Sequence, residues 1–555
     1  MEMQVKSAPQ RVPAEGFAGL KENWQSDLLS GFLVSLIALP LSLGIAGASN
    51  FPPIMGVLTA ITGGLVVAFF AGSEPTIKGP AAGLIVIVAG CVDELGRGDM
   101  ALGWHLALGV IVIAGLLQIV LGLLKVAKLA DFFPLAAVHG MLAAIGIIIM
   151  SKQIHLAVGI APGEMKGKDP LELIGMVPHS LMNMEWHIAL IGVVSLIILF
   201  GMPLVNNPVL KKIPAALVVL VAAVLMGLVF HLSDVNQYGS VKPLVAPGEF
   251  KLGLNVSFDA WWGDLLPTAL KYMAMFTLIG SLESLLTGKA IDLLDPYKRK
   301  SNLSKDLTAV GIGNTLAGML GGLPMISEVA RSSANLSNGG KTRWANFFHG
   351  AFLLIFVVAL VPFIKLVPVA ALAAILIAVG FRLANPKEFR HMYRIGPEQL
   401  IVFVVTIIAT LATDLLIGIG VGIATEFIMQ LVLGLPVKHL FNPDQKLVSV
   451  GNHHTLTISG AAVFTNYLSI KKQLDTIPQQ AGQHVTVDLH HARYVDHTVM
   501  ENLHNYKYDF QLAGGEFHVI NLDDHKPMSA HPLAARRKAP ATVPARPSTT
   551  AAGLR

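Results

Sequence analysis

Long apolar runs repeat along most of the chain, between residues 28 and 433. Each has roughly twenty residues, the length of a helix that crosses a hydrocarbon core about 30 Å thick. About fourteen such runs can be counted, several of them short or interrupted by glycine and proline. The pattern predicts an α-helical protein whose chain crosses a membrane many times.

The character of the chain changes after residue 435. Residues 436–446 resemble a linker, and residues 447–527 alternate strand-like and helix-like patterns, which predicts a small cytoplasmic α/β domain. We expect strands at 454–458, 484–489 and 517–520 and helices at 467–477 and 498–513. A polar cytoplasmic segment, 1–24, precedes the membrane domain of residues 25–435. The end of the chain, 528–555, is rich in Ala, Pro, Arg and Lys and is predicted to be disordered.

Composition narrows the classes of function. Hydrophobic residues make up 53% of the chain and charged residues 14%, and the net charge of +5 is too small and dispersed for nucleic acid. A single cysteine, Cys91, allows neither an internal disulfide nor a thiolate metal cluster. His490, His491, His497 and His504 lack the spacing of a ligand set, so we expect no metal site. No nucleophile or phosphate-binding loop is apparent, and we expect no enzyme.

Basic residues are distributed unevenly among the loops. If the amino terminus is cytoplasmic, the inside loops hold clusters such as Lys298, Arg299 and Lys300, whereas the outside loops hold scattered cations such as Arg97 and Lys168. This matches the positive-inside rule with both termini in the cytoplasm. Residues 1–24 contain no small-residue cleavage site, so the first apolar run is expected to be a retained span. The expected location is the inner or plasma membrane.

Two glycine- and proline-rich breaks interrupt the apolar pattern at matching places in the two halves. The first is Lys78-Gly79-Pro80-Ala81-Ala82-Gly83, and the second is residues 321–335, which contain Glu328 and Arg331. Matched breaks of this kind indicate the binding site of a transporter. Each interrupted helix would present free N–H groups and a positive dipole end near the membrane midplane, which suits an anion. Close packing of small residues is the alternative for the first break alone.

These segments together resemble the sulfate permease (SulP) family of anion transporters. The resemblance is carried by Ala38-Leu39-Pro40, Gly79-Pro80, the segment of residues 280–287, Pro324 with Arg331, and a carboxy-terminal region similar to STAS domains. It implies about fourteen spans in seven-plus-seven inverted repeats, divided into core and gate domains. It also implies a homodimer and elevator-like alternating access.

The resemblance further implies which residues form the site. The anion-binding residues would be Leu41, Ile45, Ala81, Ser327, Glu328, Val329 and Arg331, and the small Ala82 would let backbone amides approach the ligand. The sodium-coupled bicarbonate branch of the family binds its cation through positions that match Glu283 and Thr287 here. We expect no cofactor apart from a bound Na⁺ or H⁺.

Glu328 departs from the small or hydroxyl residues that the family usually has at this position. A carboxylate would repel the substrate unless it is protonated or paired with Arg331. Either it makes transport proton-linked, or it turns outward and fixes the helix in place. Glu283 also has a structural alternative, in which it pairs with Lys271 or Arg331.

The function expected from the sequence is secondary active transport of a small inorganic oxyanion, of the sulfate or bicarbonate type, coupled to H⁺ or Na⁺. The expected partners are the small anion, the lipid bilayer and a second copy of the chain, with no nucleic acid. Two alternatives remain: a dicarboxylate or nucleobase carrier on the same fold, and an anion sensor or scaffold that moves no ions.

Overall fold

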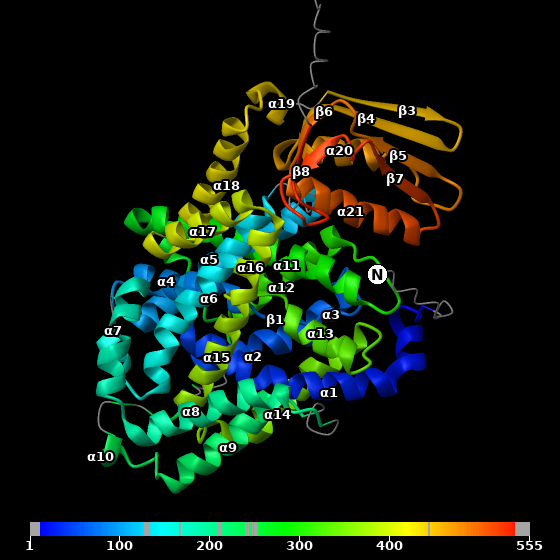
Figure 1. The fold of residues 1–555 in the computed structure, drawn as a ribbon. Coiled ribbons are helices and arrows are strands. Elements are labelled where there is room, and N and C mark those ends of the chain that lie inside the picture. Colours follow the sequence, from blue (N-terminus) through cyan, green and yellow to red (C-terminus); the bar gives the residue numbers. More distant parts are fainter. Residues whose placement is uncertain are drawn as a thin grey trace, which may run out of the picture. The chain divides into compact units, whose positions relative to one another are not determined.

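The computed structural model describes residues 12–538, apart from gaps at 127–132, 166–167, 208–212, 239–240, 242, 247, 249–252, 414 and 442–443. The chain forms two compact units (Figure 1). The first, called here the helical unit, contains the chain up to residue 388, except 131–136, together with residues 403–422. The second, the carboxy-terminal unit, contains residues 131–136, 389–402 and everything from residue 423 onward.

The first half of the helical region follows the predicted pattern of long spans around one short, broken segment. Its elements are α1 (Gly16–Ala48), α2 (Pro53–Thr62), η1 (Gly63–Val67), α3 (Ala68–Phe70), β1 (Lys78–Pro80), η2 (Ala82–Leu84), α4 (Ile85–Gly96), α5 (Met100–Leu123), α6 (Leu135–Ala157), η4 (Pro162–Met165), α7 (Pro170–Met182), α8 (Trp186–Gly201), η5 (Met202–Leu204), α9 (Ala215–Val229) and α10 (Val235–Tyr238).

The second half has the same arrangement, with a short, broken third span among longer helices. Its elements are η7 (Asp259–Trp261), η8 (Gly263–Leu265), α11 (Leu266–Leu294), α12 (Leu303–Leu320), β2 (Met325–Ser327), α13 (Val329–Ser337), α14 (Trp344–Ile364), α15 (Val369–Leu383), α16 (Pro386–Ile395), α17 (Pro397–Ala412) and α18 (Leu415–Val432). In each half a three-residue strand precedes the short third span, α4 or α13, and the two strands pair antiparallel. This is the relation expected of inverted repeats.

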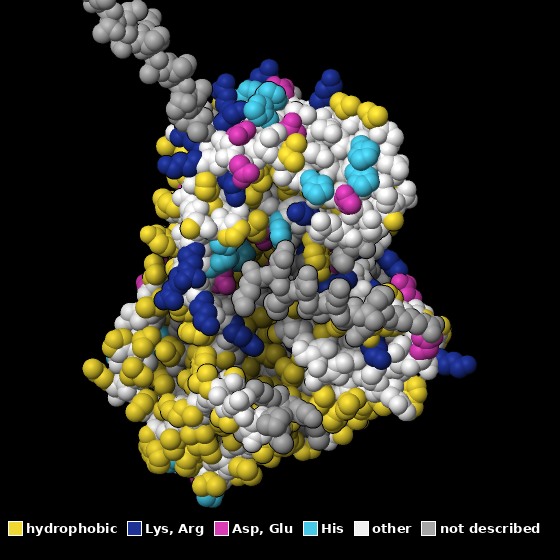
Figure 2. Space-filling view, turned by 45° about the vertical axis from the view of Figure 1, so that its right-hand side comes forward, with side chains coloured by type: hydrophobic (Ala, Val, Ile, Leu, Met, Phe, Trp, Pro, Cys, Tyr) yellow, Lys and Arg dark blue, Asp and Glu magenta, His cyan; other side chains and the backbone are white. Residues whose placement is uncertain are grey.

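Length and composition make eight of the described helices able to cross a membrane, and three shorter apolar helices add to them. The long helix α1 has Pro40 in its interior, which spans tolerate where neighbouring helices cover the freed backbone groups. Large apolar side chains stay exposed on α8 and α9, among them Ile197, Leu225 and Val229. Figure 2 shows apolar side chains gathered over the surface of the helices. A surface of this kind is suited to lipid.

The carboxy-terminal unit contains a mixed sheet covered by two helices (Figure 1). Its strand order is β7-β5-β4-β6-β9-β8, with β3 paired to β4. The strands β4, β5, β6 and β7 are parallel to their neighbours in this group, whereas β3, β8 and β9 join antiparallel. The elements are α19 (Val437–Phe441), β3 (Asp444–Val450), β4 (His453–Ala462), α20 (Phe464–Leu474), β5 (His484–Asp488), β6 (Ala492–Val495), α21 (His497–Leu512), β7 (Glu516–Ile520), β8 (His525–Pro527) and β9 (Arg536–Lys538).

The predicted α/β pattern of this unit is confirmed. Alternating residues of the strands, such as Val485 and Val487, are fully buried against Leu503 and Phe510 of α21. The prediction of disorder from residue 528 does not hold for the described part of the tail. There β9 pairs with β6 and β8, and the preceding Ala534 and Ala535 are fully buried. Residues 539–555, also within that prediction, lie outside the described residues.

Asp496 begins α21 from a fully buried position. Its Oδ1 accepts a hydrogen bond from the Val499 amide at 2.7 Å, and its Oδ2 accepts one from the Phe464 amide at 2.6 Å. Burial raises the pKa of this carboxyl to about 6, although the two amides and the nearby His497 oppose the shift. Asp496 therefore joins the start of α20 to the start of α21, and its carboxyl has a raised pKa as a result of the burial.

Candidate functional site

Two extended segments cross inside the helical unit. Strand β1 lies antiparallel to β2, with Lys78 opposite Ser327 and Pro80 opposite Met325. The Ala81 amide extends this pairing by donating to the Pro324 carbonyl oxygen at 3.2 Å. Past the crossing, β1 leads through η2 into α4 and β2 leads into α13. Two helices thus begin beside the crossing, and the first N–H groups of each have no partner within the helix.

Two carboxylates converge on the turn that starts the first of these helices. Glu328 Oε1 accepts a hydrogen bond from the Ala82 amide at 3.5 Å. A side chain at Gly83 would collide with the Glu283 carboxylate, which shows that this carboxylate of α11 lies directly against the turn. Both glutamates are only 8% exposed, and they are close enough to repel each other. The turn at Ala82 and Gly83 therefore has two buried acids beside it.

Glu283 forms no ion pair in the described part of the chain. Its Oε2 has no hydrogen-bond partner among the described residues. Lys271, one of the partners considered from the sequence, instead pairs with Glu94 at 3.1 Å. Thr287 lies one turn further along α11 and is 3% exposed. The structure therefore gives no support to Glu283 as an acid paired with Lys271 or Arg331.

Arg331 bonds to a serine of α1 and forms no ion pair with Glu328 among the described residues. Its Nη2 donates to Ser42 Oγ at 3.2 Å. Its Nε and Nη1 have no partner within the same residues. A side chain at Gly79 would collide with the guanidinium, so this glycine leaves the space that Arg331 occupies. The fully buried guanidinium remains near enough to attract Glu328, as does Arg382 of α15.

The residues predicted on α1 lie in the protein interior. Leu41 and Ile45 are 7% and 1% exposed. Between them, Leu43 and Gly44 line a cavity of about 900 Å³, whose other walls come from α4, α6 and α15 and from the segments 159–173 and 241–246. None of the predicted anion-binding residues lines this cavity, whereas Val329 at the start of α13 is 47% exposed.

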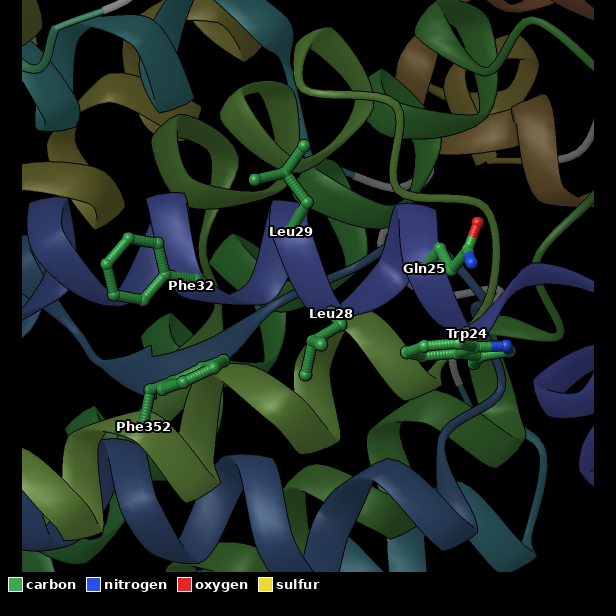
Figure 3. A pocket seen from close by; sticks show the side chains of 6 residues that line it. All are labelled: Trp24, Gln25, Leu28, Leu29, Phe32 and Phe352. Atoms are coloured by element: carbon green, nitrogen blue, oxygen red, sulfur yellow. The ribbon is translucent and has the colours of Figure 1, made fainter.

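Another pocket of the helical unit has a different character. Trp24, Gln25, Leu28, Leu29 and Phe32 of α1 line it together with Phe352 of α14 (Figure 3). Figure 3 shows Phe32 and Phe352 on the facing sides of two neighbouring helices. Since Gln25 is the one polar lining residue and no charged residue is among them, the pocket offers nothing to hold an anion.

The sequence analysis missed one part of the crossing. Lys78 is fully buried and pairs with Asp306 of α12 at 2.8 Å. Ser327, expected to bind an anion, has no exposed surface. Its hydroxyl accepts a hydrogen bond from Lys78 and donates one to Asp306. The available signal was a lysine directly before Gly79-Pro80 and an aspartate within the apolar run of α12. An ionisable residue inside an apolar run usually has a partner that neutralises it.

Comparison with known proteins identifies the group to which this fold and crossing belong. The family model described as the sulfate permease family matches residues 24–406. The chain belongs to the sulfate permease family. The members it resembles are transporters rather than enzymes, and the chain is accordingly a multi-pass membrane protein of an anion transporter family.

Individual relatives are distant but extend over most of the chain. A putative sulfate transporter of Bacillus subtilis, YvdB, is 25% identical over 506 residues, which cover 90% of this chain and 92% of the relative. The transmembrane domain of the cyanobacterial bicarbonate transporter BicA superposes with a TM-score of 0.63 at 25% identity, covering 72% of this chain and 98% of that domain. Murine Slc26a9, an anion transporter, superposes with a TM-score of 0.63 at 17% identity, covering 89% and 85% of the two chains. This last likeness concerns the fold alone.

Proposed function

We propose that this protein is a secondary active transporter of a small inorganic oxyanion of the sulfate or bicarbonate type. The observation that carries the proposal is the half-buried Ala82 amide, which donates to an oxygen of the buried Glu328 carboxylate at 3.5 Å. An amide at the start of a helix that can donate to one oxyanion can donate to another in its place. The names of the relatives, which include sulfate and bicarbonate transporters, agree with this substrate class.

The anion site combines two helix starts with one buried cation. The first N–H groups of α4 and α13, beside Ala81, Ala82, Glu328 and Val329, would bind the oxygens of the substrate. Leu41 and Ile45 would close the site on the α1 side, and Ser327 would contribute through its backbone. Arg331, with two nitrogens unpartnered among the described residues, would supply positive potential at short range.

Coupling follows from the charge of the two glutamates. Two unit charges about 4 Å apart repel by about 4 kcal/mol at an effective dielectric constant near 20. An anion that arrives at the Ala82 amide therefore meets strong repulsion from Glu328 unless that carboxyl takes up a proton. Glu283 would bind the coupling cation, H⁺ or Na⁺, with the Thr287 hydroxyl as a further ligand for Na⁺. Anion and cation would then travel together as symport.

The transport cycle proposed for the chain is an elevator. The crossing and the helices attached to it would move as one body against the remaining helices, which would form the gate and the contact with a second copy. Both termini would lie in the cytoplasm of a cell whose inner or plasma membrane holds the protein, because the basic loops cluster on that side.

A substrate panel in proteoliposomes tests the proposal. Uptake of radiolabelled sulfate and bicarbonate would be measured with and without inward gradients of Na⁺ and H⁺, next to a dicarboxylate and a nucleobase. We expect one of the two oxyanions to accumulate and one of the two gradients to drive it. Uptake of the dicarboxylate or the nucleobase alone would contradict the substrate class, and uptake of nothing would favour a sensor.

A further inference from the structure

Lys78 has a complete set of partners inside the helical unit. Its ammonium donates to Thr76 Oγ1 at 2.7 Å, to Asp306 Oδ1 and Oδ2 at 2.8 and 2.9 Å, and to Ser327 Oγ at 2.7 Å. An ammonium has three protons, so Thr76, Asp306 and Ser327 account for all of them. No exposed surface remains on the lysine. The positive charge of Lys78 is therefore neutralised by Asp306 inside the protein.

The Ser327 hydroxyl takes part in the same hydrogen-bond network. Ser327 Oγ accepts a hydrogen bond from Lys78, and its own O–H donates one to Asp306 Oδ2 at 2.8 Å. A serine hydroxyl has one proton to donate. It cannot give that proton to an anion without breaking the network.

Asp306 connects this network to the rest of the unit. Its Oδ1 also accepts a hydrogen bond from the Gly72 amide at 3.0 Å, which precedes β1. About two turns further along the same helix, Asn314 Oδ1 accepts a hydrogen bond from the Met325 amide at 2.6 Å. Helix α12 thus holds both ends of β2, and the Lys78–Asp306 pair holds β1 to the same helix.

We propose that Lys78 is a positioning residue of the anion site, which acts by fixing how β1 crosses β2. The proposal rests on the proposed function, since the site it positions is the pair of helix starts beside that crossing. Lys78 and Asp306 cancel each other in charge, so their contribution is to the placement of the Ala82 amide against Glu328. A small slide of one strand along the other would separate these groups, whose hydrogen bond is already 3.5 Å long.

The test compares four full-length variants in proteoliposomes and in solution. Lys78→Met removes the ammonium, and the double variant Lys78→Asp with Asp306→Lys restores an ion pair with the charges exchanged. Thr76→Val removes one acceptor of the ammonium and leaves the pair intact. Lys271→Met is the control, since it removes a lysine of α11 whose ion pair with Glu94 is partly exposed. Transport of radiolabelled sulfate or bicarbonate gives KM and Vmax, and hydrogen exchange gives the protection of residues 76–84 and 324–331.

Lys78→Met should raise KM about tenfold, the loss expected when a buried charged hydrogen bond is broken. Exchange should accelerate at the crossing and stay unchanged in β4 and β5 of the carboxy-terminal unit. The exchanged pair should recover most of the affinity, and Lys271→Met should behave as the wild type. If Lys78→Met does not fold, Thr76→Val should give the same pattern with a KM increase of about threefold.

A wild-type KM or wild-type exchange at the crossing in Lys78→Met, or in Thr76→Val where Lys78→Met does not fold, would overturn the proposal. Failure of the exchanged pair to recover any affinity would also overturn it, because the lysine would then act on the anion through its charge. If the wild-type protein moves neither anion, the proposed function fails, and the exchange measurement still decides whether Lys78 fixes the crossing.

Discussion

At the scale of single residues, the site is defined by side chains that lack partners. Glu283 and Arg331 each retain buried atoms without a hydrogen bond among the described residues, and Glu328 reaches only one amide. Buried charges normally have partners, because desolvation without compensation is costly. Beside the two helix starts, we therefore propose that Glu283, Glu328 and Arg331 meet the mobile ions. Lys78 and Asp306, which are fully partnered, belong to the framework.

The residue scale also shows where the sequence could not predict the site. The spacing of Glu328 and Arg331 allowed a pair on one helix face, but Glu328 precedes the first helical turn in an extended conformation. Arg331 is drawn instead to Ser42, which is 289 positions away in the chain. The Lys78–Asp306 pair joins residues 228 positions apart. Such contacts depend on the folded crossing, whereas the identity of Glu283, Glu328 and Arg331 as unusual residues follows from their apolar surroundings.

Substitution of Glu283 by glutamine tests the cation-binding role. Glu283→Gln should abolish the dependence of uptake on the Na⁺ or H⁺ gradient while leaving some anion binding, since glutamine keeps the shape and removes the charge. The measurement is initial uptake over a series of sodium concentrations and pH values. A variant that retains the wild-type dependence would assign Glu283 to structure.

Asp496 gives a prediction for the carboxy-terminal unit. A carboxyl with a folded-state pKa of about 6, above its usual 3.8, binds protons more tightly in the folded state. It therefore favours the folded state less as the pH rises from about 4 through 6, by about 3 kcal/mol in total. Asn does not titrate, so Asp496→Asn should remove this part of the pH dependence, while its single carbonyl oxygen replaces only one of the two carboxylate oxygens that accept the Val499 and Phe464 amides.

Hydrogen exchange in β5 and β7, corrected for the intrinsic effect of pH, measures this contribution. Glu398, Glu426, Gln430, Tyr494 and His497 surround the carboxyl and are the same in both proteins. Identical pH profiles for the wild type and the Asn variant would show that Asp496 does not titrate in this range.

At the scale of elements, the breaks in the third span of each half determine the arrangement. Glycine and proline disrupt the helices at β1 and β2, the strands pair antiparallel, and one helix begins past each end of the pair. The sequence predicted these breaks and their correspondence, because glycine and proline disrupt a helix wherever the rest of the fold places them. The pairing register of β1 with β2 needed the structure, since three-residue strands without alternation specify no register.

A methyl group at Gly83 tests the contact between the turn and Glu283. Gly83→Ala places a Cβ where the Glu283 carboxylate lies, so we expect loss of at least nine-tenths of transport in a protein that still folds. Gly420→Ala in α18 is the matched control, because nothing lies within 4 Å of a Cβ there. Uptake and size-exclusion profiles of the two variants would be compared. Equal activity would mean that the carboxylate is not held against the turn.

At the scale of the whole molecule, the last helices contribute residues to both compact units. Within the carboxy-terminal unit, Phe427 and Leu433 pack against a cluster that includes Leu440, Val463 and Tyr494. The sequence predicted a boundary near residue 435 from the change in composition, which is visible in the chain. The packing of the end of α18 against the following domain does not change the composition of the sequence, so it could not be predicted.

Truncation after residue 435 tests the independence of the membrane domain. We expect the shortened protein to insert and fold, since its spans have their own buried core, and to dimerise or traffic less well. Exposure of Phe427 and Leu433 should also lower its thermal stability. Insertion is measured by protease protection and dimerisation by cross-linking. A shortened chain that fails to insert would contradict two separable modules.

The central claim is that an anion binds the amides at the start of α4 in place of the Glu328 carboxylate, which takes up a proton as the anion binds. The most direct measurement is anion affinity in the purified protein as a function of pH, for the wild type and for Glu328→Gln. The affinity of the wild type should rise as pH falls, because protonation of Glu328 removes its repulsion, and the variant should bind tightly at neutral pH with a flat profile. A Gln variant that keeps the wild-type pH profile would place Glu328 outside the anion site and would contradict the account.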